Sequence, residues 1–293
     1  MGSVGLSAYG MTAQDLVDLA TCADELGFDA LWLGEHVLHP RSYASEHPST
    51  GTAQHHTGPI VDASTELIDP WLVHAAIAAV TSRIKLGTAV YVTALRHPLH
   101  TARSTITLQE MSGGRLLFGV GSGWLEEEFA AFGVPFRTRI SRTEECLEIM
   151  RKAWSGTAFS HEGKHFRFDT VALHPQPVRV PVVLGGNGPQ ALARAARLGD
   201  AWFSSGTPGL DESCRLVDEI RGRRAELGKT DEFRCYVRIA EPSADELQRH
   251  RDRGLNDLVV WADTLWQGDT LDERRRCLTE AAHRLGVSES LTL

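Results

Sequence analysis

The sequence lacks the features that would place it in a membrane, outside the cell or on nucleic acid. No apolar run approaches the roughly 18 residues that a membrane helix needs. The first ten residues have neither the basic start nor the apolar core of a signal peptide. The formal net charge of -8 argues against a nucleic-acid partner, which usually needs a basic face. We therefore expect a cytoplasmic protein with no membrane and no nucleic-acid partner.

Cysteine is too sparse and too scattered to organise the fold. The five cysteines are odd in number and form no C-x-x-C pair, so the sequence predicts neither a disulfide framework nor a zinc knuckle. No G-x-S-x-G motif marks a hydrolase nucleophile either. The expected class is a globular protein of a reducing compartment.

The sequence does contain a regular alternation of strand-like and helix-like segments. Its 293 residues are 42% hydrophobic and 23% charged, as in ordinary globular enzymes. Short apolar runs predict eight strands, at Val4–Tyr9, Ala30–Leu33, Ile84–Val92, Leu116–Val120, Val180–Leu184, Ala201–Ser204, Phe233–Ile239 and Asp257–Trp261. Amphipathic stretches, several of them ended by glycine, predict a helix after each strand, at Thr12–Leu26, Pro70–Val80, Pro98–Met111, Arg142–Trp154, Pro189–Leu198, Leu210–Leu227, Ala244–Arg253 and Leu271–Leu285.

Strict alternation of strands and helices predicts an α/β fold built on a parallel sheet. Eight such units in this length favour a single (βα)8 TIM barrel that spans residues 1–293 as one domain. A doubly wound sheet is the alternative, but no G-x-G-x-x-G follows the first strand. Two stretches are expected as insertions: Gly34–Ile68 after the second strand and His161–Pro177 before the fifth.

The active site of such a barrel lies at the carboxyl ends of its strands. Gly185-Gly186-Asn187-Gly188 follows the fifth predicted strand and directly precedes the helix that begins at Pro189. Free backbone amides at a helix N-terminus predict a phosphate site, although a tight turn alone is the alternative. The second wall of this site is expected from the end of the sixth strand, at Ser204, Ser205 and Gly206.

Four stretches, in this order, resemble the bacterial luciferase-like oxidoreductases, and within them the branch that uses the deazaflavin coenzyme F420. They are Glu25–His36, Ile84–Pro98, Gly114–Phe136 and Val180–Phe203. The resemblance implies hydride transfer between the deazaflavin and a small organic substrate held under Gly34–Ile68. An FMN-dependent two-component monooxygenase of the same family is the alternative, and a cofactor-free barrel that acts as a binding protein is a remote one. The resemblance also implies a homodimer packed through barrel helices.

The same resemblance implies roles for individual residues. His36 would face the cofactor ring and handle a proton, and Glu35 would orient it, although relatives more often have aspartate there. Ala89–Val90 matches a non-proline cis peptide that supports the ring, with an ordinary strand end as the alternative. Ser122 and Gly123 would line the ring or its ribityl chain.

Trp124 stands where some sugar-phosphate-oxidising relatives have a catalytic glutamate, which argues against transferring that activity. It would line the substrate or simply pack at the start of a helix. Glu126, Glu127 and Glu128 are expected to form a solvated face favoured by the helix dipole. The sequence does not predict which substrate is used.

Histidines gather at His39, His47, His55 and His56. Zinc hydrolases on this barrel typically carry a His-x-His at the end of the first strand, and Val4–Tyr9 contains no histidine. The sequence therefore predicts no metal, and these histidines are expected to form a polar lid over the active site.

Overall fold

The computed structural model describes residues 2–47 and 61–287 and contains a closed barrel of parallel strands. Around the barrel the strands follow the order β1-β10-β9-β8-β7-β4-β3-β2. Their bounds are β1 (Ser3–Ala8), β2 (Ala30–Leu33), β3 (Lys85–Thr88), β4 (Leu116–Val120), β7 (Val182–Gly185), β8 (Ala201–Phe203), β9 (Arg234–Arg238) and β10 (Asp257–Trp261). This architecture confirms the predicted (βα)8 barrel.

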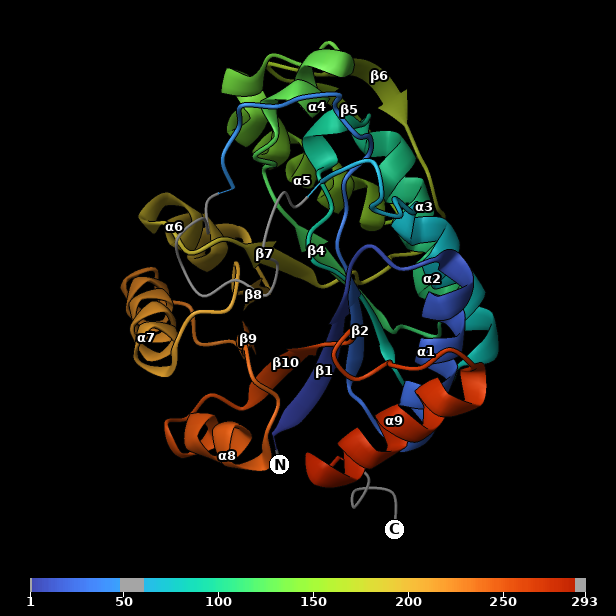
Figure 1. The fold of residues 1–293 in the computed structure, drawn as a ribbon. Helices are drawn as coiled ribbons and strands as arrows, with labels where there is room; N and C mark the ends of the chain where they lie inside the picture. Colours follow the sequence, from blue (N-terminus) through green and yellow to red (C-terminus); the bar gives the residue numbers. More distant parts are fainter. Residues whose placement is uncertain (1, 48–60, 288–293) are drawn as a thin grey trace.

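A helix follows each barrel strand and packs outside it. Figure 1 shows α1, α2 and α3 along one flank of the barrel and α6 and α7 along the opposite flank. The helices are α1 (Ala13–Leu26), α2 (Pro70–Val80), α3 (Pro98–Met111), α5 (Arg139–Trp154), α6 (Pro189–Leu198), α7 (Leu210–Glu226), α8 (Ala244–Asp252) and α9 (Leu271–Arg284). No helix in the described part of the chain has the length and apolar character needed to cross a membrane.

Both predicted insertions are present. Between β2 and α2, residues 34–47 and 61–69 form no helix or strand, and residues 48–60 lie outside the described part. The second insertion contains an antiparallel hairpin of β5 (Phe159–Glu162) and β6 (Arg167–Val171), which precedes β7. After β4, a short helix α4 (Glu126–Ala131) comes before α5, with a single turn η2 (Phe136–Thr138) between them.

The element boundaries differ from the sequence-based ones mainly after β3. The strand predicted at Ile84–Val92 ends at Thr88, and pairing with β4 resumes only at a single bridge between Tyr91 and Val120. A short 3-10 turn, η1 (Thr93–Leu95), then leads into α3. This departure from regular strand geometry places backbone of the β3–η1 connection at the carboxyl end of the barrel.

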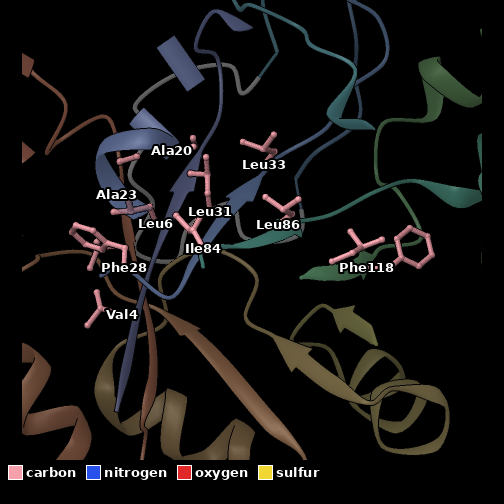
Figure 2. Close-up of a cluster of buried hydrophobic side chains, with 14 of the residues drawn as sticks. Val4, Leu6, Ala20, Ala23, Phe28, Leu31, Leu33, Ile84, Leu86 and Phe118 are labelled. Carbon is pink, nitrogen blue, oxygen red and sulfur yellow. The ribbon is translucent and has the colours of Figure 1, made fainter. Parts of the chain in front are cut away.

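The core has two layers because side chains alternate along each strand. In β2, Leu31 and Leu33 point outward and pack against helices, in a cluster that Figure 2 shows with Phe28 and residues of α1. Ala30 and Trp32 of the same strand point inward. The inner layer is a small cluster at the centre of the barrel: Ala30, Trp32, Val183, Ala201, Phe203, Tyr236 and Val259.

Trp32 is the largest side chain in this inner layer and is fully buried. Its ring centroid lies 4.7 Å from those of both Phe203 and Tyr236. The indole occupies the space beside Gly87 of β3, where an added Cβ would lie 2.3 Å from a ring carbon. Glycine is therefore needed at position 87 to make room for Trp32.

Gly87→Ala is expected to lower the free energy of unfolding by about 1–3 kcal/mol, because the added methyl group overpacks the barrel interior. The matched control is Gly222→Ala in α7, where Gly222 is exposed and nothing lies within 4 Å of an added Cβ. Alanine there is expected to raise stability by roughly 0.5–1 kcal/mol, since it favours the helix. Urea unfolding measures both signs, and an unchanged midpoint for Gly87→Ala would contradict this account of Trp32.

Candidate active site

All the barrel strands end around one cavity of about 230 Å³. Each strand or the residues just after it contribute to the lining, for example Ser7 (β1), His36 (β2), Ala89 (β3), Ser122 (β4), Gly185 (β7), Ser204 (β8), Arg238 (β9) and Trp261 (β10). The structure brings most of the predicted site residues to this cavity: Glu35, His36, Ala89, Val90, Ser122, Gly123, Trp124, Gly185, Gly186, Ser204, Ser205 and Gly206. Asn187 and Gly188 are not part of the lining.

His36 is buried in the cavity wall and is held by a residue far away in the sequence. Its Nδ1 lies 3.1 Å from Oε2 of Glu128, and Oε1 of Glu128 accepts a 2.6 Å hydrogen bond from the amide of Val37. Because a carboxylate only accepts hydrogen bonds, Nδ1 carries the proton of the neutral ring and Nε2 keeps its lone pair. The fixed imidazole can therefore exchange a proton with a ligand through Nε2.

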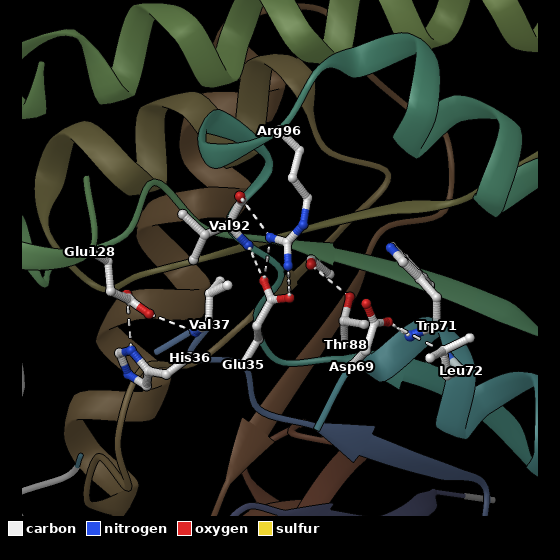
Figure 3. A network of polar contacts seen from close by, with 11 residues as sticks. Glu35, His36, Val37, Asp69, Trp71, Leu72, Thr88, Val92, Arg96 and Glu128 are labelled. Carbon is white, nitrogen blue, oxygen red and sulfur yellow. Dashed lines mark hydrogen bonds and ion pairs between the residues drawn. The ribbon is translucent and has the colours of Figure 1, made fainter. Parts of the chain in front are cut away.

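Two predictions about carboxylates are wrong. Glu128 does not belong to a solvated helix face: it is 1% exposed, because α4 turns this position inward under His36, whereas Glu126 is exposed. Glu35 does not orient His36. The two neighbouring side chains leave the end of β2 in different directions, and only that of His36 meets Glu128, as Figure 3 shows.

Glu35 instead holds the segment that follows β3. Its Oε2 accepts a 2.9 Å hydrogen bond from the amide of Val92, and its Oε1 lies 2.7 Å from Nη2 of Arg96 (Figure 3). The Arg96 guanidinium also lies over the ring of Tyr91, 4.3 Å from its centroid. Burial raises the pKa of Glu35, while Arg96 and the Val92 amide oppose that rise. Glu35 is thus a positioning residue for the turn that begins at Ala89.

The Ala89–Val90 peptide bond is cis, as the resemblance implied. Val90 projects between the ends of β4 and β7. A Cβ on Gly121 would lie 2.2 Å from one Val90 methyl group, and a Cβ on Gly185 would lie 2.8 Å from the other. Two of the glycines that line the cavity are therefore required by the packing of Val90.

The loop after β7 presents backbone amides at the start of α6. The amides of Gly186, Asn187 and Gly188 donate no hydrogen bond to the described residues, and α6 has no side-chain cap. Asn187 uses its side chain to bridge to the next loop: Nδ2 donates to the Ser205 carbonyl and Oδ1 accepts from the Ser205 amide, both at 2.8 Å. Its role is to hold the two loops together, and the amides of Gly186, Asn187 and Gly188 stand where the sequence predicts a phosphate site.

Trp124 stands at the cavity edge among aromatic and imidazole rings. The centroids of His36 and His47 lie 5.4 and 5.2 Å from its own, both edge to face, and Tyr43 packs on it at 5.9 Å. Burial is the main cause that lowers the pKa of His47 to about 4, with smaller contributions from the nearby His36 and Arg238, so His47 is neutral near pH 7.

Only part of the predicted histidine lid can be located. His47 lines the cavity, while His39 is exposed outside it. His55 and His56 lie outside the described residues. Within residues 2–47 and 61–287, no three side chains are grouped so that they could hold a metal ion.

Two features of the cavity were not predicted from the sequence: the contact of Glu128 with His36, and the presence of Arg238. Arg238 is 7% exposed and lines the cavity at the end of β9. One signal was available, because a charged residue falls inside the apolar strand predicted at Phe233–Ile239. Its inward direction follows from its spacing of two from Tyr236, which belongs to the inner layer.

Comparisons with known proteins agree with this arrangement. The family model for luciferase-like monooxygenases matches residues 2–284. An F420-dependent glucose-6-phosphate dehydrogenase of Nakamurella multipartita is 30% identical over 263 residues, which cover 87% of this chain and 70% of that protein.

Two solved structures share the fold. An F420-dependent secondary alcohol dehydrogenase in complex with an F420-acetone adduct has a TM-score of 0.73 at 17% identity, with 97% of this chain and 99% of that chain covered. The oxygenating constituent of 3,6-diketocamphane monooxygenase from Pseudomonas putida, in complex with FMN, has a TM-score of 0.63 at 19% identity, with 85% and 71% covered. The chain belongs to the luciferase-like monooxygenase family, and it is an oxidoreductase.

Proposed function

We propose that the protein is an F420-dependent oxidoreductase that transfers a hydride between the deazaflavin and a small organic substrate. The observation that carries the proposal is the cavity itself, where His36, the Ala89–Val90 turn and Gly186 of the loop before α6 line one space. The relatives support a deazaflavin or flavin cofactor. The choice of deazaflavin rests on the F420-dependent dehydrogenase that matches most of this chain.

The residues present fit such a cofactor. The amides of Gly186 and Gly188 at the start of α6 would hold a phosphate, since the positive end of the helix dipole lies there. A side chain at position 186 would be strained, because Gly186 has a φ of 111° and an added Cβ would lie 2.9 Å from Ala191. The turn at Ala89–Val90 would support one face of the ring, held in place by Glu35.

The chemistry is divided between cofactor and protein. The deazaflavin, when bound, supplies the carbon that gives or takes the hydride. His36 would hold the substrate oxygen at Nε2, accepting a proton from a hydroxyl group or, once protonated, donating one to a carbonyl group. Glu128 would keep the ring in the required tautomer and stabilise its charged form.

Cofactor titration is the first test. We expect the protein to bind F420 with a dissociation constant below about 1 μM, roughly -8 kcal/mol, and FMN at least ~10-fold more weakly. Isothermal titration calorimetry with each cofactor measures the difference. Tighter binding of FMN would instead favour a two-component monooxygenase, and binding of neither would leave only a cofactor-free binding protein.

The second test concerns His36 and its partner. His36→Ala is expected to lower turnover about 100-fold or more, with F420 affinity changed only modestly. Glu128→Gln should have a similar effect on turnover. Its carbonyl oxygen would keep the bond from the Val37 amide, so its NH2 group would face Nδ1 and force the proton to Nε2.

The tautomer can be read without a substrate, from the imidazole nitrogen-15 chemical shifts. We expect the Nδ1–H form in the parent protein and the Nε2–H form in Glu128→Gln. Glu126→Gln is the matched control, because Glu126 lies exposed on the same helix. A normal turnover rate in Glu128→Gln, despite the changed tautomer, would remove the proposed role of Nε2.

We also propose that the protein is a homodimer. The outer side of α2 and the neighbouring end of α3 expose large apolar side chains, with Leu72 at 74%, Val80 at 53% and Met111 at 53%. We take these exposed apolar side chains of α2 and α3 together as a candidate interaction patch, since such patches mark interaction surfaces in soluble proteins. The expectation that barrel helices form the contact fits this patch.

Analytical ultracentrifugation at micromolar concentration is expected to give a dimer for the parent protein and a monomer for Leu72→Arg. Leu227→Arg is the control, since Leu227 is also exposed (52%) but lies at the end of α7 on the opposite flank of the barrel. A monomeric parent protein would exclude the dimer, and dissociation by Leu227→Arg alone would move the contact to another face.

A further inference from the structure

The charged side chains that line the cavity differ in whether a polar or oppositely charged partner compensates their charge. Of the carboxylates there, Glu35 is paired with Arg96, and Glu128 is engaged by His36 and the Val37 amide. His47 is neutral near pH 7. Arg238 lines the same cavity, and no carboxylate of the described residues pairs with it.

Arg238 has few polar partners for a buried guanidinium. Its Nη2 donates to Oγ of Ser7 at 3.0 Å, and its Nε is buried with no hydrogen-bond partner. The guanidinium carbon lies 4.2 Å from the ring centroid of Trp261 and 4.9 Å from that of Phe203. Burial lowers the pKa of Arg238 to about 9, a value that still leaves it charged near pH 7.

These contacts are too weak to compensate the burial of the positive charge on Arg238. Contact with aromatic faces stabilises a cation only weakly, and one neutral hydroxyl group accepts a single hydrogen bond. An unpaired buried charge is destabilising, and the Arg238 side chain lines a ligand-sized cavity. An uncharged residue of similar volume would line the cavity without the loss of stability that a buried charge causes. The arginine therefore points to an anionic ligand group.

The position of Arg238 separates it from the proposed cofactor contacts. In the strand order β1-β10-β9-β8-β7-β4-β3-β2, three strands separate β9 from β3 in either direction, so Arg238 lies across the barrel from Ala89–Val90. Its side chain reaches toward Ser7 of β1, away from the amides that follow β7. A ring supported by Ala89–Val90 would therefore have Arg238 beyond its other face, where a substrate would lie.

We infer that Arg238 forms an anion subsite for the substrate, and that the substrate is a small carboxylate whose carbonyl or hydroxyl group faces His36. This inference rests on the proposed function for the identity of the second ligand. The subsite itself needs only Arg238, Ser7 and the cavity. Phe203 and Trp261 exclude water from the guanidinium, which strengthens its pairing with a carboxylate.

The test compares pyruvate with pyruvamide, which has nearly the same shape and no charge. Isothermal titration calorimetry is run on the protein with and without bound F420. We expect pyruvate to bind at least ~10-fold more tightly than pyruvamide, and Arg238→Met to abolish that preference while pyruvamide affinity stays the same. Equal affinities in the parent protein, or an unchanged preference in Arg238→Met, would overturn the inference.

The melting temperature of each variant provides a second measurement. Arg238→Met is expected to raise the melting temperature, because it removes an unpaired buried charge. Arg234→Met, on the same strand, is the matched control and should lower it, since Arg234 pairs with Asp257 and Asp29. A lower melting temperature for Arg238→Met would mean that the arginine is structural.

The two proposals can fail separately. If the parent protein does not bind F420 but prefers pyruvate through Arg238, the subsite stands and the proposed cofactor is wrong. If Arg238→Met loses affinity for F420 ~10-fold or more while the preference for pyruvate remains, Arg238 belongs to the cofactor site and the subsite is wrong.

Discussion

The buried carboxylate of Glu35 is the interaction on which the cavity depends. It joins the end of β2 to the turn after β3 through the Val92 amide and Arg96. That turn places Val90 between β4 and β7, where Gly121 and Gly185 leave room for it. One charged group thus fixes the relative positions of four strand ends. Because carboxylates are rarely buried without such partners, Arg96 and the Val92 amide are as necessary to the site as Glu35 itself.

The packing of Val90 also explains why two of the strand ends carry glycine. A glycine-rich strand end suggests close approach of a ligand to the backbone. At Gly121 and Gly185 the first requirement is internal, since a methyl group there would collide with Val90. Gly186 is different, because the loop before α6 requires a positive φ at this position, which glycine adopts without strain. The surface of the cavity is therefore a consequence of how the strand ends pack on one another.

The barrel was predictable from the sequence because it depends on local periodicity, and each strand and helix carries its own pattern of apolar residues and caps. Most cavity residues were predictable because strand ends meet at one place in this fold. Contacts between residues that lie far apart in the sequence were not predictable. Glu35 and His36 are adjacent in sequence yet bond to different elements, and the partner of His36, Glu128, lies 92 residues away on a helix whose inward face no short motif indicates. Arg238 was not predicted, because a charge inside an otherwise apolar strand does not by itself indicate a ligand site.

The two sides of the cavity are constrained differently, which bears on how one family can serve several reactions. On the side of β3, β4 and β7, Glu35, Val90 and the glycines are fixed by mutual packing, so a change at one position requires changes at the others. On the opposite side, Arg238 lies among Ser7, Phe203 and Trp261, and its Nε has no hydrogen-bond partner among the described residues. Substitution there would alter the ligand that fits without disturbing the barrel. The buried charge of Arg238 on that side lowers the stability of the fold, and ligand recognition explains why it is present.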